Sequence, residues 1–129
     1  VAGRAVAVDM AVTHALRPDV VALAAATGGA AASQYEAVKT AKYGAAAARD
    51  GFAFTPLVVD TFGAWGRSGL PVLDALSRRA CVRWGVSAGK ARYIVLGKLN
   101  RILMHGVASL LLANAVVARD LAAPATAAA

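Results

Sequence analysis

Hydrophobic residues recur at every second position near the start of the chain, and this spacing predicts its first strand. Between residues 5 and 13, valine or methionine alternates with alanine, Asp9 and threonine, which is the period of a strand. Residues 53–61 form an apolar run that ends near Asp60. A continuous run of this length is typical of a second strand that is buried on both faces.

Helical spacing dominates the rest of the chain. Strong helix formers fill residues 30–49, and a shorter helix is expected over residues 20–26 with Asp19 as its N-terminal cap. A third helix is predicted over residues 72–84, because a proline precedes it closely and a glycine follows it. Residues 87–119 predict either one long helix or two helices that meet at a glycine.

The order of these elements predicts a small α/β domain. A short β-sheet, with strands near 5–13 and 53–61, is expected to be covered by helices and followed by a helical C-terminal half at about 69–119. The length of 129 residues fits one domain over residues 1–121, and the alanine-rich residues 122–129 are expected to be a flexible tail.

The apolar segment at residues 102–118 has two interpretations. Its 17 residues lie at the short limit for crossing a bilayer, and it carries His105, Ser109 and Asn114. These features favour a buried helix of the core, so no membrane partner is expected. A membrane-associated subunit is the third and weakest functional alternative, after the two that are given at the end of this section. The chain begins at Val1 with a strand-like segment that does not resemble a secretory signal. We therefore expect an intracellular protein that is not secreted, and the nucleus or an organelle is among the possible compartments.

The excess of positive charge lies entirely in the second half of the chain. The net charge is +7; residues 1–66 hold five bases and five acids, whereas nine bases and two acids follow from Arg67 onward. A one-sided basic surface favours a polyanion as partner, with nucleic acid, RNA or DNA, as the commonest case. An acidic protein partner or a plain solvated surface is the alternative. The candidate phosphate-contacting residues are Lys42, Arg78, Arg79, Arg83, Lys90, Arg92, Lys98 and Arg101.

Acidic residues on the two predicted strands flank a helix that carries lysine. Asp9 and Asp60 stand on the strands, and Glu36 and Lys39 stand on the helix between them. This order indicates a site for phosphate and a divalent metal, with Asp9, Lys39 and Asp60 as candidate catalytic residues and with Asp9, Asp60 and Glu36 as candidate ligands of Mg²⁺. Simpler interpretations remain open: Asp9 pairs with Lys39 or Arg4, Asp60 caps the loop that follows it, and the helix charges form a solvated face.

Three motifs in this order resemble a known family. They are Ala5-Val-Ala-Val-Asp-Met-Ala-Val-Thr-His14, Glu36-x-x-Lys39-x-x-Lys42-Tyr43 and Phe54-Thr-Pro-Leu-Val-Val-Asp60-Thr-Phe-Gly63-Ala-Trp-Gly66. Together with the helical stretch from Ser77 to Asn114, they resemble the C-terminal segment of certain retroelement reverse-transcriptase proteins. That segment is similar to a restriction-endonuclease-like domain of the PD-(D/E)XK type.

The resemblance implies Mg²⁺-dependent cleavage of DNA phosphodiesters. Asp9 matches an acid on the core strand, Lys39 belongs to the helix signature, and Asp60 closes the next strand. The family's first acid would precede Val1, so the segment looks truncated at its N-terminus, and Ala11 stands where the family has its lysine. The catalytic set is therefore incomplete.

Two functions from different classes follow. The first is a nucleic-acid-binding domain that derives from this fold, is non-catalytic as given, and acts as a structural subunit of a nucleoprotein assembly beside other protein subunits. The alternative is a Mg²⁺-dependent endonuclease domain of a retroelement protein.

Overall fold

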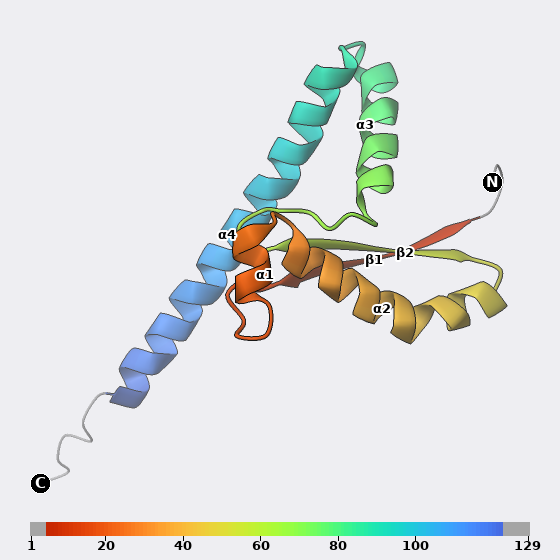
Figure 1. The fold of residues 1–129 in the computed structure, drawn as a ribbon. Coiled ribbons are helices and arrows are strands. Elements are labelled where there is room, and N and C mark those ends of the chain that lie inside the picture. Colours follow the sequence, from red (N-terminus) through yellow and green to blue (C-terminus); the bar gives the residue numbers. More distant parts are fainter. Residues whose placement is uncertain (1–4, 123–129) are drawn as a thin grey trace, which may run out of the picture.

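The protein is a small α/β domain with a helical C-terminal half, as the sequence predicts (Figure 1). The computed structural model describes the backbone of residues 5–122 and the side chains up to residue 115. The predicted tail at 122–129 therefore lies almost wholly outside the described residues. The elements are β1 (Val6–Thr13), α1 (Val21–Ala26), α2 (Ala30–Arg49), β2 (Ala53–Asp60), α3 (Leu70–Trp84) and α4 (Ala88–Ala122).

The first half forms one strand–helix–strand unit. β1 and β2 are parallel neighbours, so the chain between them must cross from one end of the sheet to the other, and α1 and α2 make this crossover. α2 lies on one face of the sheet, chiefly over β2. Ala31 and Ala32 of α2 are fully buried, because their small side chains let the helix approach its neighbours closely.

The opposite face of the sheet is only partly covered. Leu57 and Val59 of β2 are buried there, but the alternating residues of β1 are about half exposed: Val6 52%, Val8 49%, Met10 56% and Val12 50%. In the described part of the chain the sheet has two strands, so β1 also has an unpaired edge. Apolar side chains and free backbone groups therefore reach the surface along the same strand.

The second half is a helical hairpin. α3 ends at Gly85, whose φ of 62° is a left-handed conformation that glycine adopts without strain, and α4 begins three residues later. The two helices are in contact with each other, and Leu73 and Ala80 of α3 and Ala91 of α4 are buried. Figure 1 shows the hairpin standing above the sheet, with α4 continuing past the sheet on the other side.

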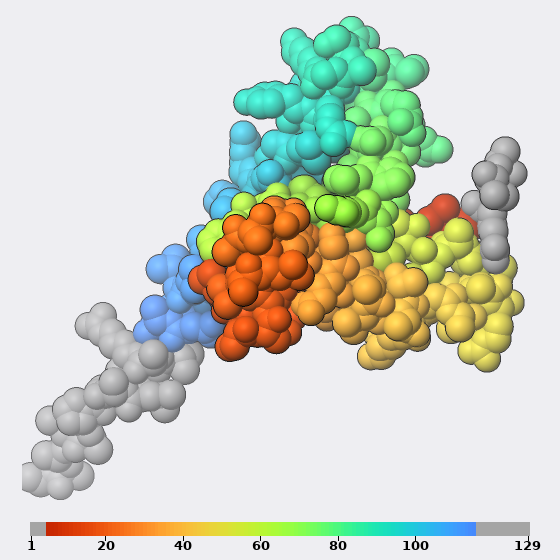
Figure 2. All heavy atoms as spheres, viewed as in Figure 1, coloured from red at the N-terminus to blue at the C-terminus, as the bar shows by residue number. Residues whose placement is uncertain are grey.

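α4 is one continuous helix of 35 residues, about 52 Å long at 1.5 Å per residue. Its middle passes the open face of the sheet, where Leu103 is buried, but Leu110, Leu111 and Leu112 are each about two-thirds exposed. The prediction of a buried core helix over 102–118 is therefore wrong for residues 102–115, whose side chains the structure describes, because most of them other than Leu103 are exposed. Figure 2 shows this part of the chain, in blue, projecting past the orange spheres of α1. By length and composition alone, Ala88–Ala115 is a candidate for crossing a membrane.

Candidate functional site

Asp9 and Lys39 form an ion pair between β1 and α2. The Lys39 Nζ atom lies 2.7 Å from an Asp9 carboxylate oxygen, and the two side chains are 17% and 34% exposed. The same Nζ atom lies 5.5 Å and 5.8 Å from the ring centroids of Tyr35 and Tyr43. The hydrogen bond with Asp9 raises the pKa of Lys39 above its ordinary value, so this amine stays protonated. The simple interpretation of Asp9 as the partner of Lys39 is confirmed, whereas Arg4 lies outside the described residues.

The ion pair lies in an open hollow of about 490 Å³ between α2 and the ends of the two strands. Its walls include the aromatic rings of Tyr43 and Phe54, which are in contact at a centroid distance of 6.0 Å, and Asp50 stands at the same rim. Because the one lysine of the hollow is already neutralised by Asp9, and Asp50 adds a negative charge, this hollow offers no surplus positive charge to a phosphate.

Glu36 is buried and satisfies backbone groups elsewhere. Its residue is 1% exposed, and its two carboxylate oxygens accept hydrogen bonds from the backbone N–H groups of Ser68 at 2.8 Å and Gly69 at 3.0 Å. These groups begin α3, where no side chain of that helix provides a cap. A negative charge at a helix N-terminus is favourable, so Glu36 on α2 serves as the cap of α3.

Asp60 is also buried and turns its carboxylate toward the loop after β2. The oxygen Oδ1 accepts hydrogen bonds from the N–H groups of Phe62 and Ala64, each at 2.9 Å, and the residue is 4% exposed. The interpretation of Asp60 as a loop cap is therefore confirmed. In the sheet Asp60 is paired with Thr13 and not with Asp9, which places Asp60 four residues further along the strand, or about 13 Å at 3.3 Å per residue.

The three predicted Mg²⁺ ligands, Asp9, Asp60 and Glu36, do not converge. Each carboxylate has a different partner, and the described residues contain no group of three histidines, cysteines or acids placed to hold a metal. Oxygen ligands of Mg²⁺ must all lie about 2.0–2.1 Å from the ion. The residues present do not fit the predicted metal site, and of the three predicted catalytic residues the structure brings together Asp9 and Lys39 but not Asp60.

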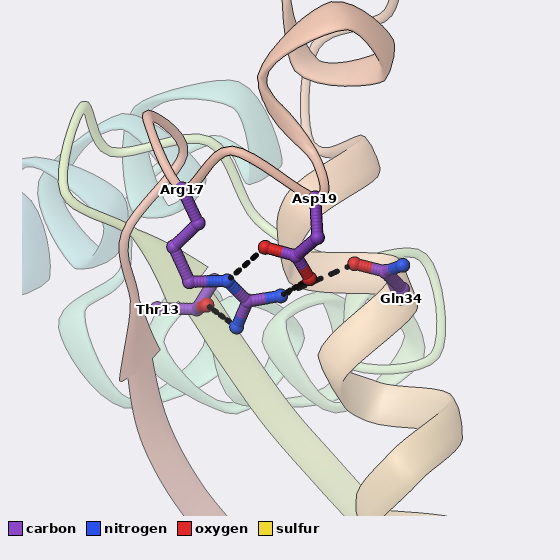
Figure 3. A network of polar contacts seen from close by, with 4 residues as sticks. All are labelled: Thr13, Arg17, Asp19 and Gln34. Carbon is purple, nitrogen blue, oxygen red and sulfur yellow. Dashed lines mark hydrogen bonds and ion pairs between the residues drawn. The ribbon is translucent and has the colours of Figure 1, made fainter.

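A polar network fixes the loop that follows β1 (Figure 3). The Arg17 guanidinium donates two hydrogen bonds to the Asp19 carboxylate, at 3.1 Å and 2.9 Å, and one each to Thr13 and Gln34. The bond from Arg17 lowers the pKa of Asp19. The expectation that Asp19 caps α1 is wrong, since α1 has no side-chain cap and the carboxylate turns to Arg17 instead. The network joins the end of β1 to α2.

The basic residues predicted to contact phosphate are mostly gathered on the α3–α4 hairpin. All seven that lie there have exposed side chains. Arg78, Arg79 and Arg83 surround a shallow hollow of about 630 Å³ together with Val82. Arg92 differs from the others because it is paired with Asp74 of α3. The eighth candidate, Lys42, lies on α2 with its Nζ atom 5.0 Å from the Tyr43 ring centroid, away from the hairpin.

Sequence reasoning missed an aromatic side chain among these cations. Trp84, the last residue of α3, is 42% exposed, and the Lys98 Nζ atom lies 5.4 Å from its ring centroid. Both residues line a groove of about 380 Å³ between the helices, which has Arg79 and Arg83 on its walls and a mostly apolar lining. The signal was available, because Trp84 directly follows Arg83 at the end of a basic helix.

Comparisons with protein-family models, with curated proteins and with solved structures found no match to this chain. The resemblance to the restriction-endonuclease-like segment of retroelement proteins therefore stays a prediction.

Proposed function

We propose that the protein binds nucleic acid through the α3–α4 hairpin. One observation carries the proposal. Residues 70–101 contain seven basic residues and one acid, a net charge of +6, and every one of the basic side chains is exposed. Of these seven basic residues, all of which the structure describes, Arg92 is the one in an ion pair with an acid, so six cations are available to phosphates.

The kinds of side chain on the hairpin favour a phosphate-rich polymer over a single small anion. Arginine presents a planar fork of donors that matches a phosphate group, and the cations are distributed along both helices. Trp84 offers a partly exposed ring beside Arg83 and Lys98, and aromatic rings next to cations are the usual platform for unpaired bases. Both backbone and base contacts are therefore within reach of the same surface.

We further propose that binding takes place without cleavage, as a structural subunit of a nucleoprotein assembly would require. Glu36 and Asp60 are engaged with backbone N–H groups, which leaves Asp9 without the other two predicted metal ligands. The Asp9–Lys39 pair is the one observation in favour of the alternative, a Mg²⁺-dependent endonuclease. That alternative predicts cleavage of DNA in Mg²⁺ or Mn²⁺ that is lost in Asp9→Asn.

The test is the salt dependence of binding to fluorescein-labelled duplex DNA and single-stranded RNA, measured by anisotropy between 50 and 200 mM NaCl. In duplex DNA each phosphate contact contributes about 0.9 to the slope of log K against log salt, so Arg79→Gln/Arg83→Gln should flatten the slope by about 1.8. For single-stranded RNA the change should be about 1.4. The matched control Arg49→Gln/Arg67→Gln also removes two exposed arginines, but both lie outside the hairpin.

The control variant should keep a slope close to that of the unchanged protein. If both variants flatten the slope equally, the protein attracts polyanions only through its net charge, and the hairpin is not the binding surface. If the unchanged protein binds neither polymer at 50 mM NaCl, the proposal is wrong.

A further inference from the structure

The groove between α3 and α4 combines an apolar lining with positive charge at its border. Trp84 and Leu99 belong to the lining, which is almost wholly apolar over a volume of about 380 Å³. Arg79, Arg83 and Lys98 line the groove as well, and all three residues are exposed. Because so little of the lining is polar, these three side chains contribute mainly their hydrocarbon stems and keep their charged ends toward solvent.

This combination matches the two chemically different parts of a nucleotide. A base is a flat ring that stacks on an aromatic side chain, and its phosphate is an anion that arginine binds with two N–H groups. A small inorganic anion would leave the apolar lining unused. An acidic peptide would use both parts of the groove, but the positive charge continues beyond it to Arg78, Lys90 and Arg101, which favours a polymer with a charge on every unit.

The position of the groove between two helices excludes the bases of a duplex. The edges of paired bases are read in the major groove of DNA, which is about 12 Å wide and admits one helix of about 10–12 Å diameter. α3 and α4 are in contact side by side. With about 8–10 Å between the axes, two packed helices are roughly 20 Å wide. The surface between them therefore stays outside the major groove, and a base reaches Trp84 only when it is unpaired.

Lys98 occupies the ring that the base would use. Its Nζ atom lies over the Trp84 ring, 5.4 Å from the ring centroid. The lysine ammonium stands at the end of a flexible stem, so it can move to a phosphate when a base takes its place on the ring. This exchange is favourable, because a base stacks on an aromatic ring more strongly than an exposed cation binds to it.

We propose that the groove holds an unpaired base stacked on Trp84, with the adjacent phosphates on Arg79, Arg83 and Lys98, so that the nucleic acid bound by the hairpin is single-stranded. This inference rests on the proposed function, in which duplex and single strand are equal candidates.

Anisotropy with fluorescein-labelled single strands and duplexes of equal length, at 50 mM NaCl, tests the stacked base. Trp84→Leu removes the ring but keeps an apolar side chain, and it should weaken binding to single strands by about 5- to 150-fold, the effect of losing one stacked base. Its affinity for the duplex should change by less than about twofold. Trp84→Phe keeps an aromatic ring and should retain most of the affinity. The matched control Phe62→Leu removes a ring that is 67% exposed outside the hairpin, and it should change neither affinity.

Tryptophan fluorescence measures the contact without depending on the stability of a variant. A single-stranded polymer should quench the emission of the unchanged protein, because a base stacks on Trp84. It should quench Trp84→Phe much less, because Trp65, the other tryptophan, lies outside the hairpin. Poly-glutamate carries charge but no bases and should not quench. Equal quenching by poly-glutamate and by the nucleic acid would show that the groove takes an acidic chain, and it would overturn the inference.

The inference and the proposed function fail in different ways. The stacked base is overturned if Trp84→Leu binds single strands as tightly as the unchanged protein, or if it loses the same affinity for the duplex. In either case the proposed function stands as long as Arg79→Gln/Arg83→Gln still flattens the salt dependence. If the unchanged protein binds neither polymer, both are overturned.

Discussion

Replacing Glu36 by alanine should destabilise the protein more than any substitution of an exposed acid. Both carboxylate oxygens accept hydrogen bonds, at 2.8 Å and 3.0 Å, in a site where Glu36 is 1% exposed. A hydrogen bond to a charged group contributes about 1.5–3 kcal/mol, and a buried donor that is left unpaired costs about 1–3 kcal/mol. After allowance for the cost of burying the charge, we expect Glu36→Ala to lower the free energy of unfolding by about 3–5 kcal/mol.

The loss should be visible as a shift of the thermal midpoint. For a domain of this length, 1 kcal/mol corresponds to roughly 3–5 °C, so Glu36→Ala should lower Tm by about 10–20 °C. Glu36→Gln retains the shape and one oxygen but turns an amide N–H toward a backbone N–H, and it should cost about 1–2 kcal/mol. The order of the two variants distinguishes a cap from a side chain that only fills space.

Urea unfolding, followed by circular dichroism and by the fluorescence of the two tryptophans, Trp65 and Trp84, provides the measurement. All variants are compared at one protein concentration, so that any association of folded chains affects them equally. Arg49→Ala, at an exposed polar residue of the same helix, is the matched control and should change stability by less than about 0.5 kcal/mol. A Glu36→Ala protein within that same margin of the unchanged protein would refute the role of Glu36 as the cap of α3.

Three further outcomes are expected. Asp60→Ala should lower the free energy of unfolding by about 2–3 kcal/mol in urea titrations, because two N–H groups of the following loop lose their acceptor. Gly66→Ala should lower it by a comparable amount, since a Cβ atom there would overlap the hydrogen-bonded Glu36 carboxylate. In Asp9→Asn, NMR titration should show the pKa of Lys39 falling toward 10.5. The stabilisation from this ion pair is present below the unfolded pKa of Lys39 and is lost as pH rises through its raised folded value. Because Asp9→Asn lacks this stabilisation, its free energy of unfolding should be lower at neutral pH and should fall less steeply as the pH is raised.

Local patterns in the sequence were sufficient to predict the elements and two of the capping and pairing interactions. The period of two over residues 5–13 and the apolar run before Asp60 each produce a strand within about one residue of the expected bounds. The pairing of Asp9 with Lys39 was one of the alternatives, because a strand acid and a helix lysine in a strand–helix–strand unit can face each other. Asp60 precedes a short loop with glycine, and that is sufficient to suggest a loop cap.

Interactions between distant segments could not be predicted. Glu36 appears on a helix face with Lys39, which suggests a solvated acid, but its partners lie 32 and 33 residues further along the chain. The exposure of Leu110 is likewise a property of what other elements leave uncovered. The hydrophobicity of residues 102–118 predicts that their side chains are buried, but it does not identify the surface against which they would pack.

Four residues are predicted to be catalytic or to bind Mg²⁺, and their structural roles determine which substitutions can test catalysis. They are Asp9, Glu36, Lys39 and Asp60. Glu36 and Asp60 are buried and hold backbone N–H groups in place, so their replacement is expected to destabilise the domain. A loss of activity in these variants would follow from the lost fold and would not identify a catalytic residue. Asp9 and Lys39 are different, because their side chains are partly exposed in an open hollow and their ion pair contributes little to stability. A cleavage activity that survived in both Asp9→Asn and Lys39→Met would therefore have no source among the acids and the lysine that the sequence assigns to it.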